Sequence, residues 1–157
     1  MSFLARTRFS PSSCAEFIVC AFCIIGSAPA SAQARECSLA DVAGQYGVTL
    51  SGTIAAVGPV AIVGQFTLDA SGRVTGAETA SFNGNVVKET VSGTATVNPD
   101  CTGTATIDVF RSGVLVRTTS LDIVVDDNQT EIRAIALTNG TTVTVIARRT
   151  FTKDDHG

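Results

Sequence analysis

The chain is short of the residues from which most catalytic and metal sites are built. Its 157 residues include no tryptophan, one tyrosine and one histidine, and only 16% are charged. That histidine, His156, lies in a polar terminal segment, where a histidine triad or metal site would have little support. The densest acidic run, Asp126-Asp127-Asn128, is typical of a hairpin turn and does not continue as a calcium loop does. The sequence therefore predicts no catalytic motif, no metal site and no cofactor.

The chain also has no hydrophobic run long enough to cross a bilayer. The longest, Phe17–Ile25, is far below the ~20 residues that a membrane-spanning helix needs. Arg6 and Arg8 precede it, and small residues follow it with motifs that fit signal-peptidase cleavage near Ala32 or Ala34. We therefore expect a signal peptide over residues 1–34, and a periplasmic or secreted product that keeps no integral membrane segment after cleavage.

The chain that remains after the expected cleavage is long enough for one modest domain. We expect a β-domain over residues 35–152 and a polar C-terminal tail over 153–157. Loss of Arg6, Arg8 and Glu16 with the signal peptide leaves 9 basic and 13 acidic side chains, a net charge of −4 with histidine neutral. This acidic balance argues against nucleic acid as a partner. The oligomeric state is left open.

Two turn signals organise the middle of the chain. Asp69-Ala70-Ser71-Gly72 suits a type I turn followed by a left-handed glycine, and Asn83-Gly84 suits a two-residue type I′ hairpin. Apolar or small residues occupy alternate positions around both turns, which predicts strands with one buried face. Similar signals separate eight predicted strands: Tyr46–Ile54, Val60–Leu68, Arg73–Phe82, Val86–Asn98, Gly103–Phe110, Val114–Val125, Glu131–Thr138 and Thr142–Phe151.

The short connections decide between two all-β architectures. Eight strands joined by tight turns favour a single antiparallel up-and-down barrel, which removes exposed edges by closing. A two-sheet sandwich is the alternative, but its Greek-key crossings need a long connection. Before the first strand, Ser38 could cap a single helical turn over Leu39–Ala43.

Only two of the five cysteines lie outside the expected signal peptide, namely Cys37 and Cys101. In an oxidising compartment such a pair usually forms a disulfide. The bridge would close a loop of 64 positions and stabilise the fold by roughly 4 kcal/mol on the loop-entropy model. Two free thiols are the alternative.

Charged residues occur at strand positions that share a face with apolar ones. Glu78 alternates with Val74 and Phe82, and Glu89 lies between Val87 and Val91. Arg117 shares its face with Leu115, Leu121 and Ile123. A charge that faces a barrel interior must be paired, because burying it alone is very costly. Glu78 and Arg117 would therefore form a structural ion pair or the polar end of a ligand pocket, unless a bulge turns both toward water.

The interior itself has two interpretations. Gly64, Gly76, Gly93 and Ala95 fall on the expected inner face, where small residues can leave a lumen or mark a bend of the sheet. If a lumen exists, its predicted ligand-binding residues are Glu78, Arg117, Phe66, Phe82 and Tyr46.

The overall pattern resembles the calycin barrels, that is, the lipocalins and avidins. The shared features are a signal peptide, a helical turn, Gly44-Gln45-Tyr46 opening the first strand, and arginines in the last strand. The resemblance implies that Arg148 or Arg149 covers the ring of Tyr46. Residues 35–39 are similar to an avidin N-terminus, although a chain without tryptophan lacks the rings that hold biotin. The phrases FTLDASGRVTG and TVNPDCTGTAT also resemble exported bacterial barrel proteins to which no activity is assigned.

Three functions are compatible with these observations. The first is a non-catalytic module that binds a small apolar or amphipathic molecule in the barrel. The second is a structural or interaction protein of the cell envelope, with Val114, Val116 and Val124 as an outer apolar patch. The third is a calycin-like isomerase or cyclase that uses the Glu78 carboxylate, which fold analogy alone suggests.

Overall fold

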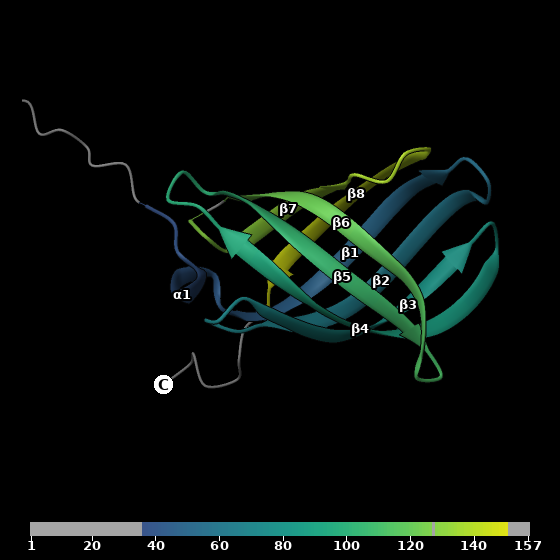
Figure 1. The fold of residues 1–157 in the computed structure, drawn as a ribbon, viewed down its shortest axis with the longest axis horizontal. Coiled ribbons are helices and arrows are strands. Elements are labelled where there is room, and N and C mark those ends of the chain that lie inside the picture. Colours follow the sequence, from purple (N-terminus) through teal and green to yellow (C-terminus); the bar gives the residue numbers. More distant parts are fainter. Residues whose placement is uncertain (1–35, 127, 151–157) are drawn as a thin grey trace, which may run out of the picture. The chain divides into compact units, whose positions relative to one another are not determined.

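Eight strands follow a four-residue helix in the computed structural model, which describes residues 36–126 and 128–150. The predicted signal peptide and polar tail lie outside the described residues. The elements, shown in Figure 1, are α1 (Leu39–Val42), β1 (Gly44–Ile54), β2 (Gly58–Leu68), β3 (Arg73–Phe82), β4 (Asn85–Val97), β5 (Thr102–Arg111), β6 (Val114–Asp126), β7 (Glu131–Ala136) and β8 (Thr141–Arg149).

Each strand pairs antiparallel with its neighbours in sequence, and β1 also pairs with β8, so that the sheet closes. The predicted eight-stranded up-and-down barrel is confirmed, and the sandwich is excluded. Most strand ends lie within two residues of the prediction. β7 stops at Ala136, two residues before the predicted end, because the chain turns there: the Thr141 N–H donates to the carbonyl of Thr138 at 3.1 Å.

The two turn signals act as their residue types predict. The Asp69 carboxylate accepts the backbone N–H groups of Ser71 at 2.9 Å and Arg73 at 3.0 Å, which holds the β2–β3 turn. Asn83 and Gly84 have φ angles of 48° and 88°, the left-handed conformations that a type I′ turn requires between β3 and β4. These local constraints set the register of β2, β3 and β4.

Helix α1 covers one end of the barrel. Ser38 caps it by accepting the Asp41 N–H at 3.3 Å, as its residue type predicts. Val42 and Tyr46 are fully buried there, and the Tyr46 hydroxyl donates to the Val42 carbonyl at 2.6 Å. The hydroxyl therefore keeps its hydrogen bond while the ring is buried, which fixes α1 on the barrel.

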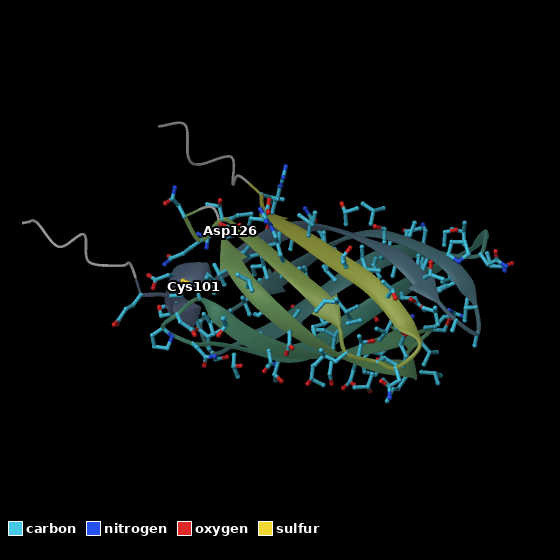
Figure 2. The ribbon with its side chains drawn as sticks, turned by 90° about the horizontal axis from the view of Figure 1, so that it is seen from above. Cys101 and Asp126 are labelled. Carbon is cyan, nitrogen blue, oxygen red and sulfur yellow. A yellow bond between two sulfur atoms is a disulfide. The ribbon has the colours of Figure 1, made fainter. Side chains whose placement is uncertain are left out.

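The two cysteines meet at the same end of the barrel. The Cys37 and Cys101 sulfur atoms lie at disulfide-bonding distance, and their Cα atoms are 5.0 Å apart. Cys101 lies in the β4–β5 turn beside α1 (Figure 2). The Cys37 N–H also donates to the Pro99 carbonyl at 3.1 Å. The predicted pairing therefore joins the segment before α1 to that turn.

The glycines of the inner face lie where neighbouring strands approach closely. A Cβ atom on Gly76 would lie 2.3 Å from the Gln65 carbonyl oxygen, and one on Gly64 would lie 2.5 Å from that of Ala77. Both distances are too short for a methyl group. These glycines thus fit the interpretation as bends of the sheet, in which a side chain would force β2 and β3 apart.

Strand β6 carries a bulge near its start. Val109 of β5 pairs with Arg117, but Phe110 pairs with Leu115, so Val116 is an extra residue. The bulge turns Leu115 outward, where it is 52% exposed, while Arg117 stays directed inward. The prediction that Leu115 shares the face of Arg117 is therefore wrong, because the alternation of faces breaks between them. Pairing of β6 with β7 begins only at Leu121.

Candidate functional site in the barrel lumen

The barrel lumen contains a cavity of about 310 Å³. Most of its lining consists of aliphatic side chains and phenylalanine rings directed inward from all eight strands. It extends from Leu68, Val74 and Ala147, below α1, to Ile54 and Phe82 at the opposite rim. The uncharged polar residues in the lining are Gln65, Thr118, Thr119, Thr138 and Thr141. The volume is at the lower end of the range for small-molecule sites.

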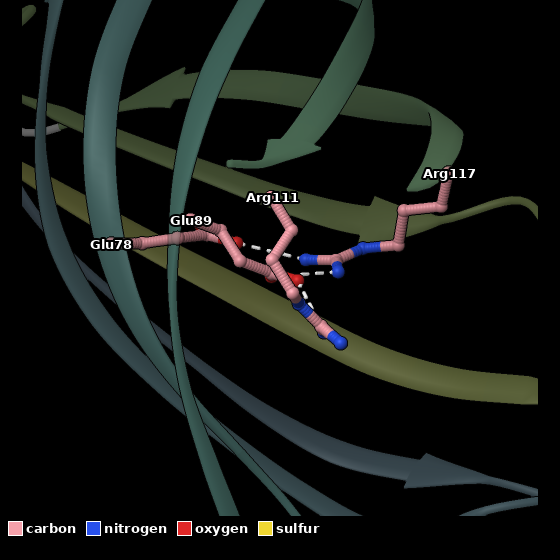
Figure 3. Close-up of polar contacts among 4 residues, drawn as sticks. All are labelled: Glu78, Glu89, Arg111 and Arg117. Atoms are coloured by element: carbon pink, nitrogen blue, oxygen red, sulfur yellow. Dashed lines mark hydrogen bonds and ion pairs between the residues drawn. The ribbon is translucent and has the colours of Figure 1, made fainter. Parts of the chain in front are cut away.

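Four charged side chains from four strands meet beside this lumen, and we call them the Glu–Arg cluster: Glu78, Glu89, Arg111 and Arg117 (Figure 3). Arg117 donates to Glu78 at 2.8 Å through one nitrogen and to Glu89 at 2.7 Å through the other. Arg111 donates to the second oxygen of Glu89 at 2.7 Å. The cluster thus contains two guanidinium groups and two carboxylates.

The strand register explains why these four residues meet. Glu78 and Glu89 are direct partners in the β3–β4 ladder. The β4–β5 ladder ends at Thr90 and Phe110, so that Glu89 and Arg111 lie just beyond its last pair. The cluster therefore links the β3–β4 hairpin to the β5–β6 hairpin where backbone pairing between them stops.

Burial differs across the cluster and determines its electrostatics. The side chain of Glu89 is 0% exposed and that of Glu78 12%, whereas Arg117 and Arg111 are 28% and 45% exposed. Burial raises the pKa of Glu78; Arg117 offsets part of this rise, and the adjacent carboxylate of Glu89 adds to it. Glu78 thus takes up a proton more readily than an exposed glutamate does.

The predicted lumen residues do not all lie together. Glu78, Arg117, Phe66 and Phe82 line the cavity, and the Arg117 guanidinium lies 5.2 Å from the centre of the Phe82 ring. Tyr46 is outside the set of described residues that line the cavity. Its ring stacks on Phe66 with centroids 5.3 Å apart, in the packed layer below α1.

The last strand places one of its two arginines over Tyr46. The Arg149 guanidinium lies 5.7 Å from the centre of that ring and donates to the Asp41 carbonyl at 2.7 Å. Arg148 instead donates to Glu131 at 2.7 Å. Arg149 and Tyr46 therefore form part of the closed end of the barrel.

Sequence reasoning missed one member of the Glu–Arg cluster. The predicted strand ends at Phe110, one residue before Arg111, so the prediction gives Arg111 no face of the sheet. The signal was present, because Arg111 continues the alternation of Ile107 and Val109. The alternation in the sequence predicts that Glu89 lies on the inner face, but its position between two arginines depends on the pairing of β3, β4, β5 and β6.

A second ionic group lies at the α1 end. Glu131 accepts hydrogen bonds from Arg133 at 2.6 Å and from Arg148 at 2.7 Å, and these bonds lower the pKa of Glu131. Within residues 36–126 and 128–150, no group of three or more His, Cys, Asp or Glu side chains is arranged to hold a metal ion. No helix of this described part is both long and apolar enough to cross a membrane.

Comparison with known proteins supports the architecture. No protein-family model and no curated protein matches the chain. Among solved structures, a redesigned β-barrel, mFAP1, determined bound to DFHBI, matches with a TM-score of 0.51 and 18% sequence identity. The match covers 74% of this chain and 100% of the barrel. At this identity the similarity shows the fold alone.

Proposed function

We propose that this protein is a non-catalytic binding module that holds a small apolar or amphipathic molecule in the barrel lumen. The observation that carries the proposal is the cavity of about 310 Å³ with its largely aliphatic lining. A water molecule finds few hydrogen-bond partners in such a cavity, whereas the transfer of an apolar molecule of matching size from water into the cavity is favourable. Glu78 and Arg117 provide a polar end for an amphipathic ligand.

The structural neighbour adds support of a general kind. The mFAP1 barrel was solved with DFHBI bound, so a barrel of comparable fold can hold a ligand. The resemblance to lipocalins and avidins implies the same use of a barrel. We further propose that the protein is exported, with Cys37 and Cys101 oxidised to a disulfide, because their pairing fits an oxidising compartment.

Uptake of the neutral apolar dye N-phenyl-1-naphthylamine tests the proposal. We expect its fluorescence to rise in the presence of the barrel and to saturate at one dye per chain. Ala134→Phe, which adds a ring to the lumen lining, should abolish the rise. Ala61→Phe, on the exposed outer face of β2, is the matched control and should bind the dye like the wild type. If the folded wild-type protein takes up no dye, the proposal is wrong.

The second candidate is a structural or interaction protein of the cell envelope. Val114, Leu115 and Val116 are 65%, 52% and 45% exposed at the start of β6, and such residues can form part of an interface. Val124 is also exposed, but it lies roughly 30 Å farther along the strand at about 3.3 Å per residue, so it does not extend this group. An empty lumen would favour this candidate. The isomerase or cyclase gains no support beyond the presence of Glu78 at the lumen.

A further inference from the structure

The Glu–Arg cluster is balanced in charge, and this balance bears on which ligand the lumen accepts. Both oxygens of Glu89 accept hydrogen bonds from arginine, one from Arg111 and one from Arg117, each at 2.7 Å. Arg117 also neutralises Glu78 at 2.8 Å. With both carboxylates ionised, the two positive charges are matched by two negative charges.

A ligand in the lumen would contact charged side chains at the Glu–Arg cluster. Glu78 and Arg117 are the charged members of the cavity lining formed by the described residues. Near the same rim, Thr138 and Thr141 contribute hydroxyl groups, and the Phe82 ring lies under Arg117. A ligand with an apolar body would thus place its polar end among an ion pair, hydroxyl groups and an aromatic ring.

A charged ligand would disturb this balance. A carboxylate bound at Arg117 would be a third negative charge beside two positive ones, and an ammonium group bound at Glu78 would be a third positive charge beside two negative ones. Either ligand leaves one partly buried charge uncompensated, which is strongly unfavourable. A hydroxyl or carbonyl group needs no counter-charge and can hydrogen-bond to a group that remains paired.

We propose that the Glu–Arg cluster selects amphiphiles whose polar end is uncharged, such as an alcohol or an amide, against carboxylates and amines of the same chain length. This inference rests on the proposed binding function and specifies the class of its ligand. The selection comes from charge balance, so one substitution in the cluster should change its direction.

Two substitutions shift the balance in opposite directions. Glu78→Gln removes one negative charge with little change in shape and leaves an excess positive charge beside the lumen. Arg111→Gln removes one positive charge at the exposed rim and leaves an excess negative charge. The first variant should gain affinity for an anionic amphiphile, and the second for a cationic one.

The test is displacement of N-phenyl-1-naphthylamine by 1-decanol, decanoate and decylamine at about pH 7.5, where the acid is ionised and the amine protonated. For the wild type we expect 1-decanol to displace the dye at a concentration at least about tenfold below that of either ion. In Glu78→Gln the affinity for decanoate relative to that for 1-decanol should rise at least about tenfold, and in Arg111→Gln the affinity for decylamine relative to that for 1-decanol should rise similarly.

The variants decide the result, because any apolar cavity favours an alcohol over an ion to some extent. If both folded variants keep the wild-type ranking and ratios, charge balance does not set the selectivity and the inference is wrong. The inference also fails if the wild type prefers decanoate or decylamine. In these cases the dye still binds, so the proposed function stands. Absence of dye uptake would overturn the proposed function, and the inference with it.

Discussion

Gly76 shows how a single inward position shapes the barrel wall. Its missing side chain allows β3 to approach the Gln65 carbonyl oxygen of β2, at a point where a Cβ atom would lie 2.3 Å from it. The inner-face glycines at such points therefore do not add to the lumen. The cavity instead lies between the aliphatic and aromatic side chains that line the lumen.

We expect Gly76→Ala to destabilise the protein by about 1–3 kcal/mol, because the methyl group must displace backbone. Gly47→Ala is the matched control. A Cβ atom there would lie 3.7 Å from the Thr150 methyl group, an ordinary contact. The control should be neutral or more stable by up to about 1 kcal/mol, since alanine reduces the freedom of the unfolded chain. Urea unfolding of both variants measures the difference, and equal midpoints would contradict the close approach of the strands.

Glu78 should give the stability a pH dependence opposite to that of most carboxylates. Its pKa is raised in the folded protein, so the folded state binds the proton more strongly than the unfolded chain does. As the pH falls from neutral toward the ordinary value of 4.5, the wild type should therefore gain free energy of unfolding relative to Glu78→Gln. Urea titrations of the two proteins across this range measure the gain.

Glu131 gives the free energy of unfolding the opposite pH dependence, and it does so at lower pH. The pKa of Glu131 is lowered by its bonds from Arg133 and Arg148, so its contribution is present above its ordinary pKa and is lost as the pH falls through the lowered one. Both Glu78→Gln and the wild type should show this loss. A difference between them that stays constant from neutral pH to the ordinary carboxyl range would show that the pKa of Glu78 is not raised.

At the scale of the elements, the closed end of the barrel depends on α1 and the segment before it. This helix has only four residues and could not persist alone. Tyr46 bonds to its last residue, Arg149 bonds to the Asp41 carbonyl, and Cys37 joins the preceding segment to the β4–β5 turn. Helix α1 and the segment before it are thus held in place by contacts with β1, β8 and the β4–β5 turn.

Replacing both Cys37 and Cys101 by alanine should reduce the free energy of unfolding by roughly 4 kcal/mol on the loop-entropy model. The loop that the bridge closes spans 64 positions, so most of the effect comes from releasing the unfolded chain. Chemical unfolding of the oxidised wild type and of the double variant measures the loss. Treating the double variant with reductant should change nothing further, whereas the wild type should fall to the same level. Equal stability of all four samples would contradict a formed disulfide.

At the scale of the whole molecule, the barrel was predictable because its signals are local. The turns at Asp69 and Asn83, together with alternation of period two, set neighbouring pairs, and seven short connections between the eight strands leave closure as the simplest outcome. The pairing of the cysteines followed from their number. The turns and strand pairs depend on residues that are close in sequence, and the cysteine pairing depends only on how many cysteines there are.

The arrangement of the Glu–Arg cluster was harder to predict because it depends on offsets between distant strands. The bulge at Val116 turns Leu115 outward, and no alternation rule places such an extra residue. Arg111 was missed because strand ends are the least certain part of a sequence-based assignment. The position of Tyr46 depends on how α1 packs on the barrel, which is a property of the packed end and not of its own strand.

The late start of the β6–β7 ladder has a consequence for how the chain avoids other copies of itself. Apart from the extra residue Val116, residues Val114–Thr119 pair with β5, but they have no strand on their other side among the residues that the structure describes. An open strand edge of this kind can act as a template for aggregation. Here a second strand would have to accommodate the extra residue Val116 and come to lie beside the inward charge of Arg117. The same arginine that balances the lumen thus makes this edge a poor starting point for intermolecular β-sheet growth.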